Sequence, residues 1–234
     1  MIKKSIEILI PAYNEEKNVE GVIKKSLLWL KSQTNDYSVL VVDDGSTDRT
    51  GEILDSLEKK YRNLKVIHHE KNLGIGRAWR TLYEFSTKEI IFTCPADQQF
   101  NPADFSRALP YIDKVDIISF YRPKKKDYSP FRLILTNINR LLIRIFFNLK
   151  IRDVNWVKMY KKEVLKQLDL KLKSALIETE ILAKVKKINK KIIEIKAPYH
   201  PRVYGKSKGA SMKTIWLSFI ELVKAYLSVR IFKY

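Results

Sequence analysis

The most informative stretch of the 234-residue chain is Val39-Leu40-Val41-Val42-Asp43-Asp44-Gly45-Ser46-Thr47-Asp48. Its apolar, mostly β-branched first half predicts a buried strand. The turn that follows can cap a helix beginning near Arg49. Ligands bind at the carboxyl ends of strands in open α/β sheets, so Asp43 and Asp44 are candidates for contacts to a ribose, a base edge or a metal. The alternative is a turn that only caps the helix.

A second apolar strand precedes a loop with an aromatic and two acidic residues. The segment Ile6–Glu16 reads IEILIPAYNEE, and Pro11 ends the strand. Tyr13 can stack on a nucleobase and Glu15 can accept a hydrogen bond from it. The alternative is that Asn14 caps an amphipathic helix.

A Gly-x-Gly pair marks a third candidate site. In the segment 72–80, NLGIGRAWR, glycines at a predicted helix start let the backbone approach a diphosphate. Arg77 or Arg80 can reach the diphosphate oxygens. The segment lacks the third glycine of a dinucleotide-binding fingerprint.

The segment 90–102, IIFTCPADQQFNP, predicts another strand that ends at the same sheet edge. Asp97 and Gln99 follow it, and their oxygens suit a hard divalent cation that also holds a diphosphate. The alternative for Asp97 is a turn residue. Cys94 is the single cysteine of the chain, which excludes an intramolecular disulfide and a multi-thiolate metal site.

Strands and helices alternate along the chain, which predicts one α/β domain with a mostly parallel sheet and helices on both faces. The expected strands lie near residues 5–11, 37–43, 64–69, 89–94, 115–120 and 191–196.

Five motifs in this order resemble the family-2 glycosyltransferases: IPAYNEE, VVDDGSTD, NLGIGRA, ADQQ and RVYGKSK. The chain is most similar to the branch of dolichyl-phosphate mannosyltransferase and other polyprenyl-phosphate sugar transferases. The resemblance implies a GT-A, Rossmann-like fold and inverting transfer of a hexose to a polyprenyl phosphate. The donor would be GDP-mannose or UDP-glucose, with Mg²⁺ or Mn²⁺ as cofactor. A phosphate nucleophile is already ionised and needs no general base, and no histidine–carboxylate pair is evident in the sequence.

The resemblance also assigns roles to individual residues. The donor would contact Pro11, Ala12, Tyr13, Glu15, Asp43, Asp44, Gly74, Arg77 and Asp97. The metal would be held by Asp97 and Gln99. The acceptor phosphate would be held by Arg122, Arg132, Arg202, Ser207 and Lys208, and catalysis would rest on Asp97, Arg122 and Arg202.

Two segments depart from the family pattern. Pro95 stands where many members have the first acid of Asp-x-Asp. The segment 153–158, DVNWVK, replaces a Thr-Ser-Gly-Phe type of sequence, and Asp153 is kept as an acceptor-side residue.

Charge divides the chain into two parts. Residues 1–121 hold 17 basic and 18 acidic residues, whereas residues 122–234 hold 28 and 8, a net charge of +20. We therefore expect a nucleotide-sugar-binding core in 1–121 and a basic acceptor-binding and membrane-interface part of the same domain in 122–234. Lysines that are simply solvated are the alternative.

Two long apolar segments, 131–149 and 214–232, carry internal charges that make membrane spanning costly. Arg140 and Arg144 share one helix face, which is typical of a basic amphipathic helix at a lipid interface. A helix that packs on the core is the alternative. With no signal peptide apparent, we expect a cytoplasmic protein, peripheral on an anionic inner membrane face.

Three rival functions remain. A transferase acting on a growing glycan or cell-surface polysaccharide would need a carboxylate base, for which Glu178 or Glu180 are candidates. A degenerate, inactive transferase would explain Pro95. A nucleic-acid-binding protein would use interleaved lysines and aromatics, but it leaves the acids at the strand ends unexplained, so no nucleic-acid partner is expected.

Overall fold

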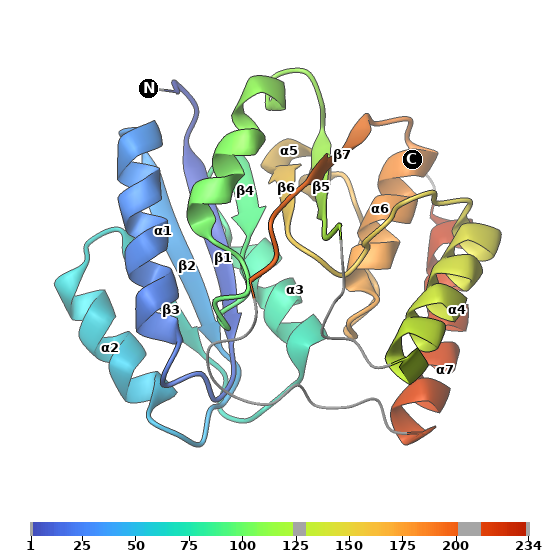
Figure 1. Cartoon of the computed structure of the whole chain (residues 1–234), viewed down its shortest axis with the longest axis horizontal. Coiled ribbons are helices and arrows are strands. Elements are labelled where there is room, and N and C mark those ends of the chain that lie inside the picture. The colour runs from blue at the N-terminus through green and yellow to red at the C-terminus, as the bar shows by residue number, and fades with distance from the viewer. Residues whose placement is uncertain (1, 124–129, 201–211, 233–234) are drawn as a thin grey trace.

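The computed structural model describes residues 2–123, 130–200 and 212–232 (Figure 1). Within these residues seven strands form one sheet in the order β3-β2-β1-β4-β6-β5-β7. β6 runs antiparallel to β4 and β5, whereas the other neighbours are parallel. The strands are β1 (Ile6–Ala12), β2 (Tyr37–Asp43), β3 (Leu64–His68), β4 (Ile90–Thr93), β5 (Ile117–Tyr121), β6 (Lys158–Lys161) and β7 (Ile192–Lys196).

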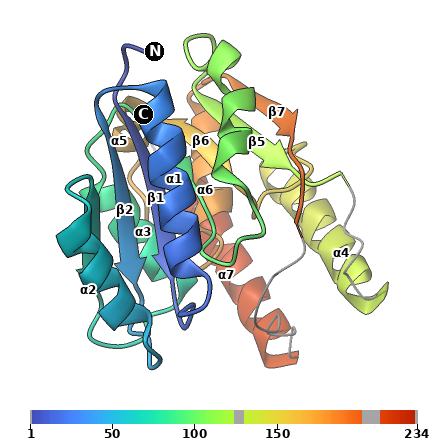
Figure 2. The ribbon, with the colours of Figure 1, turned by 60° about the vertical axis from the view of Figure 1, so that its left-hand side comes forward.

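Helices cover both faces of the sheet (Figures 1 and 2). One face carries α1 (Val19–Gln33), α2 (Thr50–Lys60) and the 3₁₀ segment η1 (Pro102–Arg107), which is followed by η2 (Leu109–Tyr111). The other face carries α3 (Ile75–Phe85), α5 (Lys162–Lys166) and α6 (Ile177–Lys187), with α4 (Pro130–Phe147) and α7 (Met212–Ile231) packed outside them. The layered arrangement confirms the α/β prediction.

Alternation along the central strands explains the two hydrophobic cores. In β1, Ile8 and Ile10 pack toward α1, while Leu9 packs toward α3 and α6. Both sides of β1 are buried, as expected for a parallel strand between two helical layers. In the α1 layer, Trp29 meets Phe92 edge-on with ring centroids 5.5 Å apart, and Phe105 packs on the same ring.

The register of the parallel strands brings their carboxyl ends together. Ala12 of β1 lies opposite Asp43 of β2, and the Asp44 N–H donates to the Ala12 carbonyl at 2.8 Å. β4 lies on the other side of β1, and the Cys94 N–H donates to the Leu9 carbonyl at 2.9 Å. The motifs IPAYNEE, VVDDGSTD and ADQQ therefore lie at the ends of three neighbouring strands, β1, β2 and β4.

The six predicted strands are confirmed within a few residues, but β6 was not predicted. Its sequence, Lys158-Met159-Tyr160-Lys161, begins and ends with lysine and shows no apolar run. The Lys158 side chain is nevertheless fully buried. The alternative that Asn14 caps a helix is wrong, because α1 begins at Val19.

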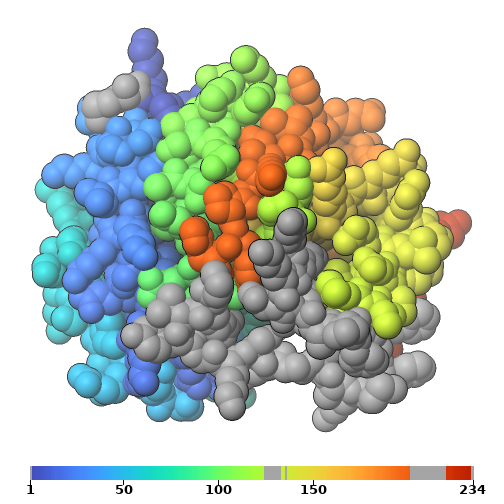
Figure 3. Space-filling model, viewed as in Figure 1, coloured from blue at the N-terminus to red at the C-terminus, as the bar shows by residue number. Residues whose placement is uncertain are grey.

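The two halves of the chain share one sheet, since β6 of the second half lies between β4 and β5 of the first, and β7 pairs with β5. Figure 3 shows the described parts of both halves adjoining across the molecule. α4 and α7 match the two long apolar segments, and Tyr226 of α7 contacts Phe146 of α4 with ring centroids 5.6 Å apart. None of the helices in the described residues is long and apolar enough to cross a membrane.

Candidate active site

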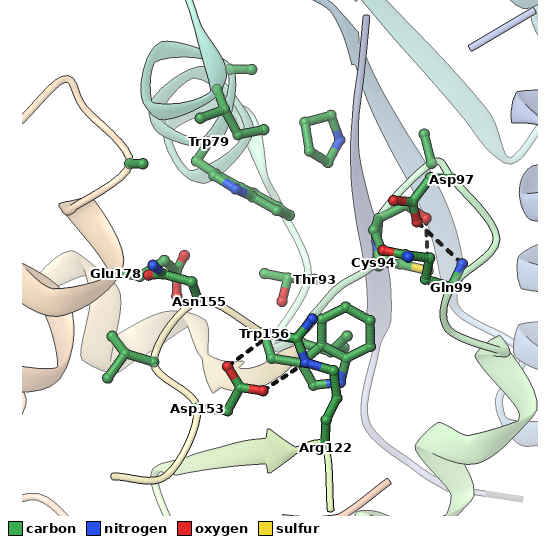
Figure 4. Close-up of a pocket in the computed structure, with 18 of the residues that line it drawn as sticks. Trp79, Thr93, Cys94, Asp97, Gln99, Arg122, Asp153, Asn155, Trp156 and Glu178 are labelled. Atoms are coloured by element: carbon green, nitrogen blue, oxygen red, sulfur yellow. Dashed lines mark hydrogen bonds and ion pairs between the residues drawn. The ribbon is translucent and has the colours of Figure 1, made fainter. Parts of the chain in front are cut away.

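A cavity of about 840 Å³ opens at the carboxyl ends of β1, β2 and β4 (Figure 4). α3, α4 and α6 contribute to its walls. Many of the predicted site residues line it: Pro11, Ala12, Tyr13, Glu15, Asp44, Gly74, Asp97, Gln99, Arg122 and Asp153. Its volume lies in the range of small-molecule sites.

The loop after β1 is fixed against the turn after β2. Asn14 has a φ of 55°, its backbone N–H donates to Ser46 Oγ at 2.9 Å, and its side-chain oxygen accepts from the Thr47 N–H at 2.8 Å. The Glu15 N–H donates to Thr50 Oγ1. These bonds join two loops that are 32 to 35 residues apart, and they position Tyr13 at the cavity.

Asp43 and Asp44 are both buried, but their carboxylates have different surroundings. Asp44 lines the cavity and accepts from the backbone N–H groups of Leu73 and Gly74 at 3.0 and 2.8 Å. Asp43 does not line it; its carboxylate accepts from the Ser46 N–H at 3.1 Å. The structure therefore gives Asp43 a role within the turn and places Asp44 alone of the pair at the cavity.

Each of these carboxylates is paired with a histidine, although no histidine–carboxylate pair is evident in the sequence. Asp44 Oδ1 lies 2.7 Å from His69 Nδ1, and Asp43 Oδ2 lies 3.0 Å from His68 Nδ1. Burial lowers the pKa of His68, but hydrogen bonds to Asp43 and Asp55 outweigh burial and raise it overall. The parallel register of β2 and β3 sets Asp43 beside His68, a relation that no sequence spacing displays.

The two glycines of the Gly-x-Gly pair have separate roles. Gly74 precedes α3 with a φ of 89° and lines the cavity, with open space where a Cβ would be. Gly76 is buried, and a Cβ there would lie 2.1 Å from the Ser174 backbone. Arg77 does not line the cavity, and Arg80 donates to Glu84 and to the Leu170 carbonyl. Gly74 therefore lines the cavity, whereas Gly76, Arg77 and Arg80 do not.

We expect Gly76→Ala to destabilise the fold by about 1–3 kcal/mol, because the added methyl group requires α3 to move away from the Ser174 backbone. Gly21→Ala in α1 is the matched control, since a Cβ there meets atoms no closer than 3.4 Å. Urea unfolding of the two variants measures the difference. Equal midpoints would contradict the packing role of Gly76.

Asp97 and Gln99 are adjacent in the loop after β4. The Gln99 N–H donates to Asp97 Oδ1 at 3.1 Å, and Gln99 Nε2 donates to the Tyr199 hydroxyl at 2.8 Å. The latter bond turns the amide oxygen of Gln99 away from Tyr199. A carboxylate and an amide carbonyl are suitable oxygen ligands for Mg²⁺ or Mn²⁺. Among the described residues no group of three or more His, Cys, Asp or Glu side chains forms a metal site, so a cation here would take its other ligands from substrate and water.

Arg122 lines the same cavity as Asp97 and Gln99. Its guanidinium donates to both oxygens of Asp153, at 2.7 and 3.0 Å, and both side chains are nearly buried. The guanidinium carbon lies 4.2 Å from the Trp156 ring centroid and 5.7 Å from that of Tyr199. The fork of hydrogen bonds and the aromatic rings fix the Arg122 side chain at the cavity wall.

Several predicted acceptor residues lie outside what the structure describes. These are Arg202, Ser207 and Lys208, together with the side chain of Arg132. The structure adds two cavity arginines that the prediction did not assign to the acceptor, Arg140 of α4 and Arg152.

A buried polar cluster lies behind the cavity wall, which its member Glu178 lines. Lys158 Nζ lies 2.8 Å from Glu178 Oε2 and donates to the carbonyls of Val154 and Trp156. The Tyr83 hydroxyl also donates to Glu178. The Tyr160 hydroxyl donates to the same carboxylate at 2.5 Å. Burial and the Glu178 charge raise the pKa of both tyrosines, which keeps them protonated as donors.

The two candidate carboxylate bases differ in position. Glu178 lines the cavity, whereas Glu180 does not. Glu180 is fully buried and accepts from the backbone N–H groups of Lys171 and Leu172 at 2.9 Å and from the Lys184 ammonium at 2.6 Å. Glu180 therefore has a structural role.

Known proteins with similar sequences belong to one family of transferases. The sequence model described as "Glycosyl transferase family 2" matches residues 7–169. Undecaprenyl-phosphate 4-deoxy-4-formamido-L-arabinose transferases are similar over 92% of this chain, with 27% identity for the protein of Photorhabdus laumondii subsp. laumondii and 24% for that of Pectobacterium atrosepticum. The chain spans 66% of the length of these relatives.

Solved structures show a similar fold. Glucosyl-3-phosphoglycerate synthase from Mycobacterium tuberculosis, in complex with Mn²⁺, UDP and phosphoglyceric acid, superposes with a TM-score of 0.74 at 15% identity, covering 99% of this chain and 80% of that one. TarS 1–349 from S. aureus, in complex with UDP, gives 0.65 at 20% identity, with coverages of 96% and 65%. The expected GT-A fold is thereby confirmed.

Proposed function

Since this chain belongs to glycosyl transferase family 2, we propose that it transfers a sugar from a nucleotide sugar to a polyprenyl phosphate. The single observation that carries the proposal is that one cavity holds both the strand-end carboxylates and arginine side chains. The carboxylates that follow the strand ends, Asp44 and Asp97, line this cavity together with Arg122. The curated relatives, whose names specify undecaprenyl phosphate as acceptor, support the same acceptor class.

The donor binds with its nucleoside against the loop after β1. Tyr13 offers a ring for stacking, and Glu15 and Asp44 offer oxygens to the base and ribose. The diphosphate then extends toward Asp97 and Gln99. These two residues would hold a divalent cation, which would supply positive charge to the leaving diphosphate.

The chemistry is a direct displacement. An oxygen of the acceptor phosphate attacks the anomeric carbon, the bond from that carbon to the diphosphate breaks, and the nucleoside diphosphate leaves, with inversion. The enzyme needs to place two anions close together, and the arginines that line the cavity serve this purpose. Arg140 and Arg152 add positive charge beside Arg122.

The engagement of Glu178 weighs against the rival transfer to a glycan hydroxyl. Such a transfer requires a carboxylate that can take up a proton. The Glu178 carboxylate already accepts from two tyrosine hydroxyls and pairs with Lys158, so most of its acceptor positions are occupied. Glu180 does not reach the cavity.

Transfer of label into an organic-extractable lipid is the test. The purified protein is given undecaprenyl or dolichyl phosphate, Mn²⁺ and one labelled donor: GDP-mannose, UDP-glucose or UDP-linked 4-deoxy-4-formamido-L-arabinose. Mannose or glucose is the sugar we propose. Label in the lipid phase supports the proposal, and label recovered only in water-soluble glycan contradicts it.

An anionic membrane surface is the proposed partner of α4 and α7. Four exposed apolar residues of α4 recur at helical spacing, and the described part of α7 exposes four more beside its contact with α4. They are Ile134, Ile138, Leu141 and Ile145 on α4, and Ile220, Val223, Leu227 and Ile231 on α7. Arg140 and Arg144 lie on the same helix, and the half of the chain that contains both helices is strongly basic.

We expect the double change Leu141→Asp, Ile145→Asp to lower binding to anionic liposomes by about 100-fold, because each apolar side chain inserted in lipid contributes about 1.5–3 kcal/mol. Leu28→Asp is the matched control, since Leu28 is 74% exposed on α1, far from these helices. Co-sedimentation at low salt measures the binding. Equal binding of the double variant and the control would contradict the proposal.

A further inference from the structure

Part of the cavity is left over after the nucleotide and the acceptor phosphate have been assigned. In the proposed reaction the anomeric carbon lies between the diphosphate at Asp97 and the attacking phosphate at Arg122. The rest of the sugar must then extend into the adjoining space, which is bordered by Trp79, Asn155 and Glu178 (Figure 4).

Trp79 forms one wall of this space. Its ring is stacked on Tyr83 of the same helix, with centroids 5.9 Å apart and planes at 17°. Tyr83 is in turn held edge-on by Tyr160 at 5.7 Å. Because Tyr83 and Tyr160 pack behind it, the half-buried indole of Trp79 is fixed at the cavity. Its flat apolar surface suits the C–H face of a pyranose ring.

Glu178 and Asn155 supply a polar edge. A carboxylate offers about four acceptor positions on its two oxygens. Among the described residues, Tyr160 and Lys158 use Oε2 and Tyr83 uses Oε1, so one position on Oε1 remains. The exposed Asn155 amide lies beside it and has both donor and acceptor atoms. Together they can bind a pair of neighbouring hydroxyl groups.

We infer that Trp79, Asn155 and Glu178 form the subsite that recognises the sugar of the donor. The sugar is a pyranose that lays one C–H face on Trp79 and presents free hydroxyl groups to Asn155 and Glu178. This inference rests on the proposed function. The loss of a hydroxyl that is hydrogen-bonded to the buried Glu178 is what makes such a subsite selective.

Trp79→Ala and Asn155→Ala test the subsite, because they should weaken binding of the sugar and leave binding of the nucleotide unchanged. Calorimetry with Mn²⁺ compares UDP-glucose with UDP, GDP-mannose with GDP, and UDP-linked 4-deoxy-4-formamido-L-arabinose with UDP. For the donor that the wild-type protein transfers, each variant should weaken nucleotide-sugar binding by about tenfold or more. Binding of the free nucleoside diphosphate should stay within about twofold of wild type. Trp79→Phe, which retains a ring, should recover most of the loss.

Phe85→Ala is the matched control, because Phe85 is a 55% exposed aromatic on the same helix and does not line the cavity. Circular dichroism and urea unfolding verify that each variant folds. A Trp79→Ala protein that loses nucleotide and nucleotide-sugar binding equally, or that behaves as Phe85→Ala does, overturns the subsite. In either case the wild-type lipid assay still reports on the proposed function by itself.

Discussion

Asp97→Asn should lower sugar transfer by about 10²–10³-fold while leaving the fold intact. The side chain is 93% buried in the loop after β4, and its Oδ1 accepts the Gln99 N–H. Asparagine keeps the shape and that hydrogen bond, so the variant removes only the negative charge. Without that charge the site would lack the one protein carboxylate proposed to hold a cation, and the leaving diphosphate would be less well neutralised.

The measurement is the initial rate of lipid labelling over a titration of Mn²⁺ or Mg²⁺. If the charge acts through the cation, the variant should need far more metal to reach half of its own maximal rate. Asp104→Asn in η1 is the control, because that carboxylate pairs with Arg107 Nε at 3.0 Å and does not line the cavity. Full turnover by Asp97→Asn at wild-type metal concentrations would refute the metal role. A wild-type protein without turnover on any donor would instead favour the inactive-transferase hypothesis.

The strands and the donor end of the site could be predicted because local signals and the geometry of parallel sheets coincide there. Apolar runs end in polar loops at residues 11, 43 and 94, and adjacent parallel strands bring those loops to one edge. The sequence could not separate Asp43 from Asp44. Successive residues at a strand end point in different directions, and whether each one meets the cavity or the turn depends on the loops that pack around it.

The wall of the cavity could not be predicted, because it depends on contacts between distant segments. Glu178 is 95 residues from Tyr83, which donates to it, and 20 residues from Lys158. A lysine within a short strand has no periodic or motif signal, and fully buried lysines are rare unless they are paired. Gly76 was misassigned for a similar reason: a glycine needed for close packing on Ser174 has the same sequence pattern as one needed for a phosphate.

Lys158→Met should destabilise the protein by about 3–5 kcal/mol, because it leaves the buried Glu178 carboxylate without its cation. The carbonyls of Val154 and Trp156 also lose their donor. Urea unfolding measures the loss. Lys161→Met, in the same strand, is the matched control and should cost less than about 1 kcal/mol, since its ammonium is 4.0 Å from Asp116.

A second change distinguishes the ion pair from simple packing. Adding Glu178→Gln to Lys158→Met removes the unpaired charge, so the double variant should be more stable than Lys158→Met alone, and the double-mutant cycle should give a coupling energy of about 1–3 kcal/mol. Equal stability of Lys158→Met and Lys161→Met would contradict the account.

The loop that Lys158 holds carries both Asp153 and Trp156, which fix Arg122. The folded fraction of Lys158→Met should therefore show a raised KM for the polyprenyl phosphate while its affinity for the free nucleoside diphosphate remains that of wild type.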